Sequence, residues 1–166
     1  GVWRALNRGV PNGGWWRKIH IWIGDPTLEI RVVEVSHSRI GGAPMLPDLL
    51  RQIPADKERG SVTAGGASDT RKGHDAMAAR NAHAVIPPRK NAKLWKHDTP
   101  GARARNEAVR ASKYLGSALW RQVTGYHRRS RVETKMHCVK LLGQRLSARD
   151  FDRQVAEIQI RAAILN

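Results

Sequence analysis

The sequence predicts an α/β or α+β fold, in which a mixed β-sheet is followed by helices that cover it. Alternating apolar residues near the start predict a β-hairpin, and two short apolar runs in the middle predict further strands. Apolar residues at helical spacing dominate the last third of the chain. A length of 166 residues is enough to bury the core of one domain without disulfides or structural metals.

The hairpin is predicted from period-two alternation. Ile19, Ile21 and Ile23 alternate with other residues, as on a half-buried strand. The residues at 24–27 supply turn chemistry, and residues 29–35 form the second strand. The sequence therefore begins its regular structure with two paired strands.

A short helix is expected next. Its apolar residues at helical spacing are Leu46, Leu49, Leu50 and Ile53. Pro44 and Pro47 fit such a helix only in its first turn, since proline has no backbone N–H to donate. The helix is therefore expected to begin near these prolines.

Two more strands and a helix complete the first half. Residues 61–64 are a brief strand candidate, and residues 84–86 are a buried strand that ends at Pro87. Asp69 or Thr70 is expected to cap the helix that runs between them through Arg80. The predicted order is strand, strand, helix, strand, helix, strand.

The second half is predicted to be a basic loop followed by helices. The loop is expected over residues 89–105. Three helices are expected after it: one that ends near Gly125, one over about residues 127–146, and one that begins after a capping box at Ser147 and Asp150. The first of these helices has an apolar face made of Val109, Ser112, Leu115, Leu119 and Val123, and the last has one made of Phe151, Val155, Ile158, Ala162 and Leu165. The chain thus divides into a sheet-containing part (1–88), the loop (89–105) and a helical part (106–166).

Positive charge is the strongest compositional signal. Lys and Arg number 30 against 14 Asp and Glu, which gives a net charge of +16. Between Arg89 and Arg149 there are 16 basic and three acidic residues, so +13 of the total lies there. A polyanion such as nucleic acid is the partner that this charge predicts. A solvated basic surface, or a protein of ribosomal type, would have a similar composition.

The sequence predicts a cytoplasmic protein. No apolar run approaches the roughly 20 residues that span a bilayer, and no secretory signal is visible, so a membrane role is not expected. Cys138 is the only cysteine and is predicted to be a buried thiol. The seven histidines do not have the spacing of a zinc site. Four tryptophans could stack on unpaired bases, although tryptophans are more often core residues: Trp15, Trp16, Trp95 and Trp120.

One motif predicts a site for chemistry. Tyr126, Arg129, Glu133 and Lys140 would fall within an arc of about 60° on a single helix, at about 100° per residue. A carboxylate among cations suits a site for metal and phosphate, because the carboxylate holds a divalent cation while the cations contact phosphate oxygens. The alternative is an ordinary ion pair between Arg129 and Glu133, four residues apart.

The spacing of this motif resembles the Y-R-E-K signature of DDE transposases in the bacterial group that includes insertion sequences four and five. Further segments resemble that family in the same order and cover nearly the whole chain: Trp16-Arg17-Lys18-Ile19-His20-Ile21, Leu46-Pro47-Asp48-Leu49-Leu50, Gln52-Ile53-Pro54-Ala55-Asp56, Ile86-Pro87-Pro88-Arg89-Lys90-Asn91-Ala92 and Ala148-Arg149-Asp150-Phe151-Asp152-Arg153-Gln154-Val155. Linked motifs of this kind are more specific than any one of them.

The resemblance implies a ribonuclease-H-like catalytic domain, present here without its first strand and with a helical C-terminal part. In that family two Asp and one Glu hold two Mg²⁺ ions for phosphodiester cleavage and strand transfer. Glu133 would be the third carboxylate, a catalytic residue and metal ligand. The residues implied to contact DNA are Tyr126, Arg129, Lys140, Arg89 and Lys90.

Double-stranded DNA with the terminal inverted repeats of a transposon is the implied partner, and a location near the bacterial nucleoid is expected. The oligomeric state stays open, with a homo-oligomer as one option. Two of the three carboxylates depart from the family pattern, however. The resemblance places the first Asp on a strand ahead of residue 1. Gly65 stands where the second is expected, at the start of Gly65-Gly66-Ala67-Ser68-Asp69, and Asp69 is read as a helix cap.

The sequence therefore predicts a transposase-derived protein that binds DNA, with impaired Mg²⁺ binding and without the ancestral strand cleavage. Whether any enzymatic activity is retained stays open. The alternative function is that of a non-catalytic DNA-binding remnant that interferes with an intact transposase.

Overall fold

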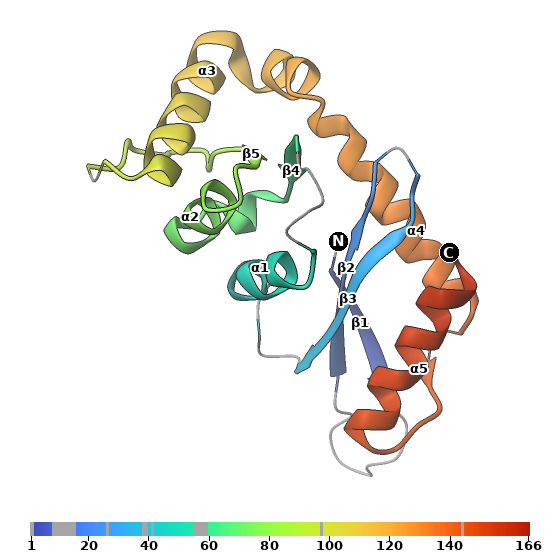
Figure 1. Cartoon of the computed structure of the whole chain (residues 1–166). Coiled ribbons are helices and arrows are strands. Elements are labelled where there is room, and N and C mark those ends of the chain that lie inside the picture. The colour runs from blue at the N-terminus through green and yellow to red at the C-terminus, as the bar shows by residue number, and fades with distance from the viewer. Residues whose placement is uncertain are drawn as a thin grey trace. The chain divides into compact units, whose positions relative to one another are not determined.

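A computed structural model describes the chain except residues 1, 8–15, 26, 38–39, 41, 55–59, 97 and 144 and the side chains of residues 2–7 and 16. The described residues form a mixed α/β structure of two compact units (Figure 1). The first unit combines residues 1–41 with 130–166, and the second spans residues 42–129. The units are not contiguous in the sequence, because the chain returns to the first unit after the central segment.

The first unit is built on a four-stranded sheet with the strand order β3-β2-β1-β6. Its strands are β1 (Val2–Asn7), β2 (Trp16–Ile23), β3 (Ile30–His37) and β6 (Arg145–Leu146). β2 is antiparallel to both β1 and β3, and β6 is parallel to β1. The predicted hairpin is confirmed as β2 and β3, with Ile19 opposite Val35.

The expectation that no strand precedes the hairpin is wrong, because β1 does so. Its sequence, VWRALN, does not alternate between apolar and polar residues, so periodicity gave no signal for it. The turn at Asn12-Gly13-Gly14, between β1 and β2, lies outside the described residues.

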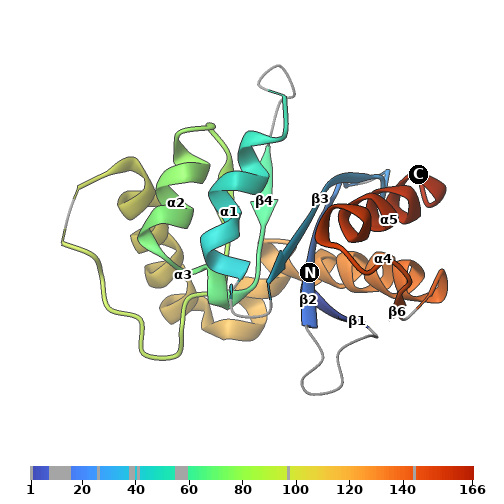
Figure 2. The same cartoon turned by 90° about the horizontal axis from the view of Figure 1, so that it is seen from below.

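Two helices, α4 (Ser130–Leu141) and α5 (Phe151–Ile164), cover one face of this sheet (Figure 2). The core between helices and sheet contains Ile19, Ile21, Ile30, Val35, Met136, Val139, Leu146, Ile158 and Ala162. Asp150, which the predicted capping box places in the first turn, is itself the cap of α5, since its carboxylate accepts the N–H of Arg153 at 2.9 Å. Ser147 is not the cap, and Phe151 lies exposed at the edge, where it stacks on His37.

The second unit begins with α1 (Gly42–Arg51), which buries Leu46, Leu49 and Leu50 as predicted. Pro47 lies inside this helix and not in its first turn, which removes one backbone hydrogen bond. The strands β4 (Ser61–Thr63) and β5 (His83–Val85) pair in parallel and confirm the two short strands. The helix α2 (Arg71–Ala78) lies between them in the sequence.

The long helix α3 (Pro100–Val123) ends near Gly125 as predicted, but it begins earlier than expected and is interrupted. Thr99 caps it, so the basic loop ends before residue 105. Gly116, with φ of 76°, breaks the helical geometry and changes the face that the second half buries. Trp120 is consequently buried, while Leu119 and Val123 of the predicted apolar face are exposed.

The helix predicted over residues 127–146 is also shorter. A 3₁₀ turn, η2 (Tyr126–Arg129), precedes α4, and α4 ends at Leu141, just ahead of Gly143 with φ of 142°. Cys138 on α4 is half-buried, and not fully buried as predicted. Within the described part of the chain, no helix has the length and apolar character needed to cross a membrane.

Candidate functional site

Gly65 lies just after the end of β4, in the second unit. Its backbone is extended, with φ of −70° and ψ of 159°, so any residue type could adopt this conformation. A Cβ built on Gly65 would lie 3.6 Å from Nε of the half-buried Arg129. A guanidinium therefore lies beside the position where the resemblance places the second catalytic Asp.

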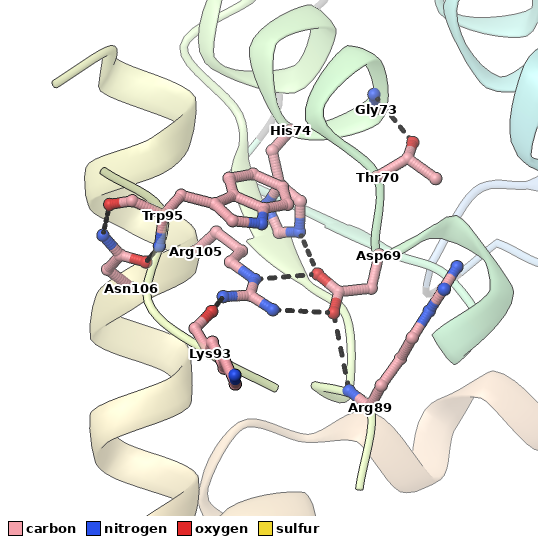
Figure 3. Close-up of polar contacts among 9 residues, drawn as sticks. All are labelled: Asp69, Thr70, Gly73, His74, Arg89, Lys93, Trp95, Arg105 and Asn106. Atoms are coloured by element: carbon pink, nitrogen blue, oxygen red, sulfur yellow. Dashed lines mark hydrogen bonds and ion pairs between the residues drawn. The ribbon is translucent and has the colours of Figure 1, made fainter. Parts of the chain in front are cut away.

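Asp69 lies four residues further on and is almost fully buried, with 7% of its surface exposed. Its carboxylate accepts hydrogen bonds from Nε2 of His74 at 3.2 Å and from Nε and Nη2 of Arg105 at 3.1 and 3.2 Å (Figure 3). A weaker bond comes from the backbone N–H of Arg89, at 3.4 Å. Both carboxylate oxygens are thus engaged by the protein itself.

Burial on its own would raise the pKa of Asp69. The hydrogen bonds from His74 and Arg105, together with the charge of Arg105, outweigh burial and hold the pKa well below its ordinary value. Asp69 is therefore ionised. Of the two caps predicted for α2, Thr70 is confirmed, since its hydroxyl accepts the N–H of Gly73, and Asp69 is not the cap.

His74 and Trp95 complete this buried cluster. Within the described residues, Nδ1 of His74 is buried without a hydrogen-bond partner, so the proton is assigned to Nε2, which donates to Asp69. The ring of Trp95 meets the ring of His74 edge-on at 5.5 Å and contacts the guanidinium groups of Arg71 and Arg105. Trp95 therefore belongs to the packing of the second unit.

The same cluster fixes the basic loop that follows β5. Arg105 also donates to the backbone carbonyl of Lys93, and Asn106 bonds both the N–H and the C=O of Trp95, at 2.9 and 3.0 Å (Figure 3). The exposed cations of this loop are Arg89, Lys90, Lys93 and Lys96. Backbone groups thus point toward the protein and cationic side chains toward solvent.

The four residues of the Y-R-E-K motif do not lie on one helix, so the single stripe predicted for them is wrong. Tyr126 and Arg129 belong to η2 in the second unit, whereas Glu133 and Lys140 belong to α4 in the first. Tyr126 packs against Trp120, with ring centroids 6.2 Å apart. Glu133 is exposed and lies seven residues before the half-buried Lys140, on the same face of α4.

These positions do not fit a two-metal centre. The described residues contain no group of three or more His, Cys, Asp and Glu side chains that could hold a metal ion. Gly65 offers no ligand, and the oxygens of Asp69 are bound by Arg105 and His74. Glu133 is the one carboxylate of the expected set that is both present and exposed.

The elements and the composition define the class of protein: a mixed α/β protein with a strong excess of positive charge. The family model described as the transposase DDE domain matches residues 8–166. The chain therefore belongs to the DDE transposase family, and its role is connected with DNA transposition. Members of this family generally use a divalent metal and act on DNA. No solved structure matches the chain.

Proposed function

We propose that this protein is a transposase derivative that binds duplex DNA and no longer cleaves it. The observation that carries the proposal is the exposed basic surface of the second unit, including Arg89 and Lys90, together with glycine at position 65. Phosphate contacts supply most of the affinity in such a surface and depend little on base sequence.

The element order supports a ribonuclease-H-like fold. Three consecutive strands in antiparallel pairing are followed by α1, β4, α2 and β5. The second Asp of the family is expected where a strand ends, and Gly65 follows the end of β4. The spacing of the Y-R-E-K motif is what favours the group of insertion sequences four and five.

Loss of cleavage follows from the ligand set. Two Mg²⁺ ions held close together repel each other, so they require several carboxylates. Glu133 can be one ligand, but Gly65 offers no carboxylate, and the guanidinium of Arg129 lies next to it. Binding of Mg²⁺ as a catalytic pair is therefore impaired in this proposal.

Tyr126, Arg129 and Lys140 keep a part in binding. Arg offers a planar fork and Lys a point charge to phosphate oxygens, and the hydroxyl of Tyr can donate to them. We propose that the DNA they contact includes a transposon terminal inverted repeat. Assembly into a homo-oligomer and location at the bacterial nucleoid are parts of the same proposal, which sedimentation and imaging can test.

A nicking assay tests the loss of cleavage. The protein is incubated with Mg²⁺ and a duplex that carries a terminal inverted repeat, and no cut strand is expected. Gly65→Asp is also expected to be inactive, because its carboxylate would lie beside Arg129 and pair with it. Nicking that EDTA abolishes and that Glu133→Gln removes would overturn this part of the proposal.

The second candidate function is interference with an intact transposase. It is favoured by the combination of a retained basic loop and a glycine at position 65, since such a protein would occupy DNA without processing it. Co-expression with an active relative is the test. Interference predicts a lower transposition frequency, whereas an unchanged frequency would rule out interference and leave DNA binding as the only proposed function.

A further inference from the structure

The loop of residues 89–96 is held in place by side chains from elsewhere in the second unit. Asp69 binds the N–H of Arg89 at its start, Arg105 binds the carbonyl of Lys93 in its middle, and Asn106 binds the backbone of Trp95 near its end. A turn between Arg89 and Ala92, closed by an N–H···O bond of 2.9 Å, shapes the first part. Four separate contacts therefore fix a segment of eight residues.

The cations of this loop are available to a ligand. Arg89, Lys90, Lys93 and Lys96 are exposed, and none of the ion pairs formed among the described residues involves them. The nearest acid in the sequence, Asp98, pairs with Arg103 at 3.0 Å. The loop therefore keeps its full positive charge on the side that faces solvent.

A loop that is already ordered loses little conformational entropy when it binds. Arg105 is central to this ordering because its guanidinium spans Asp69 and the backbone of Lys93 at once. The negative charge of Asp69 in turn offsets the desolvation cost of burying Arg105, since an unpaired buried cation is strongly unfavourable. Asp69 thus controls the shape of a surface to which its own carboxylate is not exposed.

We propose that residues 89–96 form a pre-shaped loop that binds backbone phosphates of duplex DNA, and that Asp69, Arg105 and Asn106 are its positioning residues. This inference rests on the proposed DNA-binding function and deepens it. It adds Lys93 and Lys96 to the contact surface, and it gives the retained Asp69 a role that needs no metal.

The first test measures how DNA affinity depends on salt. Lys93→Ala combined with Lys96→Ala is expected to reduce the slope of log K against log salt by about 1.8, at about 0.9 for each phosphate contact. The matched control is Arg31→Ala with Arg153→Ala, which removes two exposed, ion-paired charges from the first unit. An equal loss of slope in both variants would overturn the loop assignment.

The second test separates positioning from stability. Asp69→Asn and Asn106→Ala are expected to weaken binding several-fold in the natural chain and to have little further effect once all four loop cations, Arg89, Lys90, Lys93 and Lys96, are alanines. Met77→Ala, which opens a cavity in the core of the same unit and removes none of the hydrogen bonds that hold the loop, is the control for lost stability. If Asp69→Asn fails to fold, Asn106→Ala alone decides.

The possible failures are distinct. If the natural chain does not bind duplex DNA, the proposed function is wrong. If it binds and the loop variants bind equally well, the proposed function stands and this inference is wrong. If Asp69→Asn or Asn106→Ala weakens binding by the same factor with and without the loop cations, these residues do not act through the loop.

Discussion

Asp69 and Glu133 are both acidic residues of segments that resemble family signatures, yet they lie in opposite environments. Asp69 is buried and bound by Arg105 and His74, whereas Glu133 is exposed on α4. A buried carboxylate whose oxygens are all engaged stabilises the protein that surrounds it, and an exposed one can meet an external ligand. An acidic residue that lies in a signature-like segment therefore has no fixed chemical role, because its burial and its partners decide what the carboxylate can do.

The largest expected effect is on stability. Asp69→Ala should lower the free energy of unfolding by about 3–5 kcal/mol, because it leaves Arg105 buried without its counter-charge. Glu133→Ala should change it by less than about 0.5 kcal/mol, as is usual for exposed positions. Urea denaturation of the two variants side by side measures the difference, and equal losses would break the comparison.

The pH dependence of stability distinguishes the two units, because the first unit contains a buried titratable group of its own, His20. Burial and the charge of Lys18 lower the pKa of His20 from 6.5 to about 4. His20 is then neutral in the folded state while the unfolded chain takes up a proton, so stability falls as the pH drops from about 6.5 to 4.

The loss through His20 should be at most about 3.5 kcal/mol, at about 1.4 kcal/mol for each pKa unit. His20→Gln, which can still bond Ser36, should remove this part of the pH dependence. Asp69 acts at lower pH, because its pKa is depressed below the ordinary carboxyl value, and Asp69→Asn should leave the fall between 6.5 and 4 unchanged. Stability curves of the three proteins against pH check this, and an unchanged curve for His20→Gln would contradict it.

A smaller effect is expected when the charge of Arg105 is kept and its geometry is lost. Arg105→Lys can pair with Asp69 but cannot also span to the carbonyl of Lys93, so we expect a loss of about 1–2 kcal/mol. Thermal unfolding measures the loss. Stability equal to that of the natural chain would show that charge alone holds the cluster together.

Local patterns predicted much of the fold. Alternation identified β2 and β3, and helical spacing identified α1, whereas the capping box placed the cap of α5 three residues too early, at Ser147. β1 was missed because its residues do not alternate, and the second half of α3 was misassigned because one residue with positive φ changes the buried face.

The role of Asp69 could not be read from local patterns, since its side-chain partners lie 5 and 36 residues away. One signal was present: Arg105 shares a helix face with Ala102 and Val109, so a cation on a buried face required a carboxylate partner. The single stripe predicted for the Y-R-E-K motif was wrong for a different reason. The spacing of 100° per residue holds within one α-helix, but the motif spans a 3₁₀ turn and an α-helix.

The most direct test of DNA binding without cleavage is the affinity of the intact chain for duplex DNA, measured over a range of salt concentrations in the presence of Mg²⁺. Four phosphate contacts from the loop alone predict that log K falls with log salt with a slope of about −3.6 or steeper, at about 0.9 per contact. Heparin should compete, and the recovered DNA should be uncut. An affinity that hardly changes with salt, or that heparin leaves intact, would contradict the account.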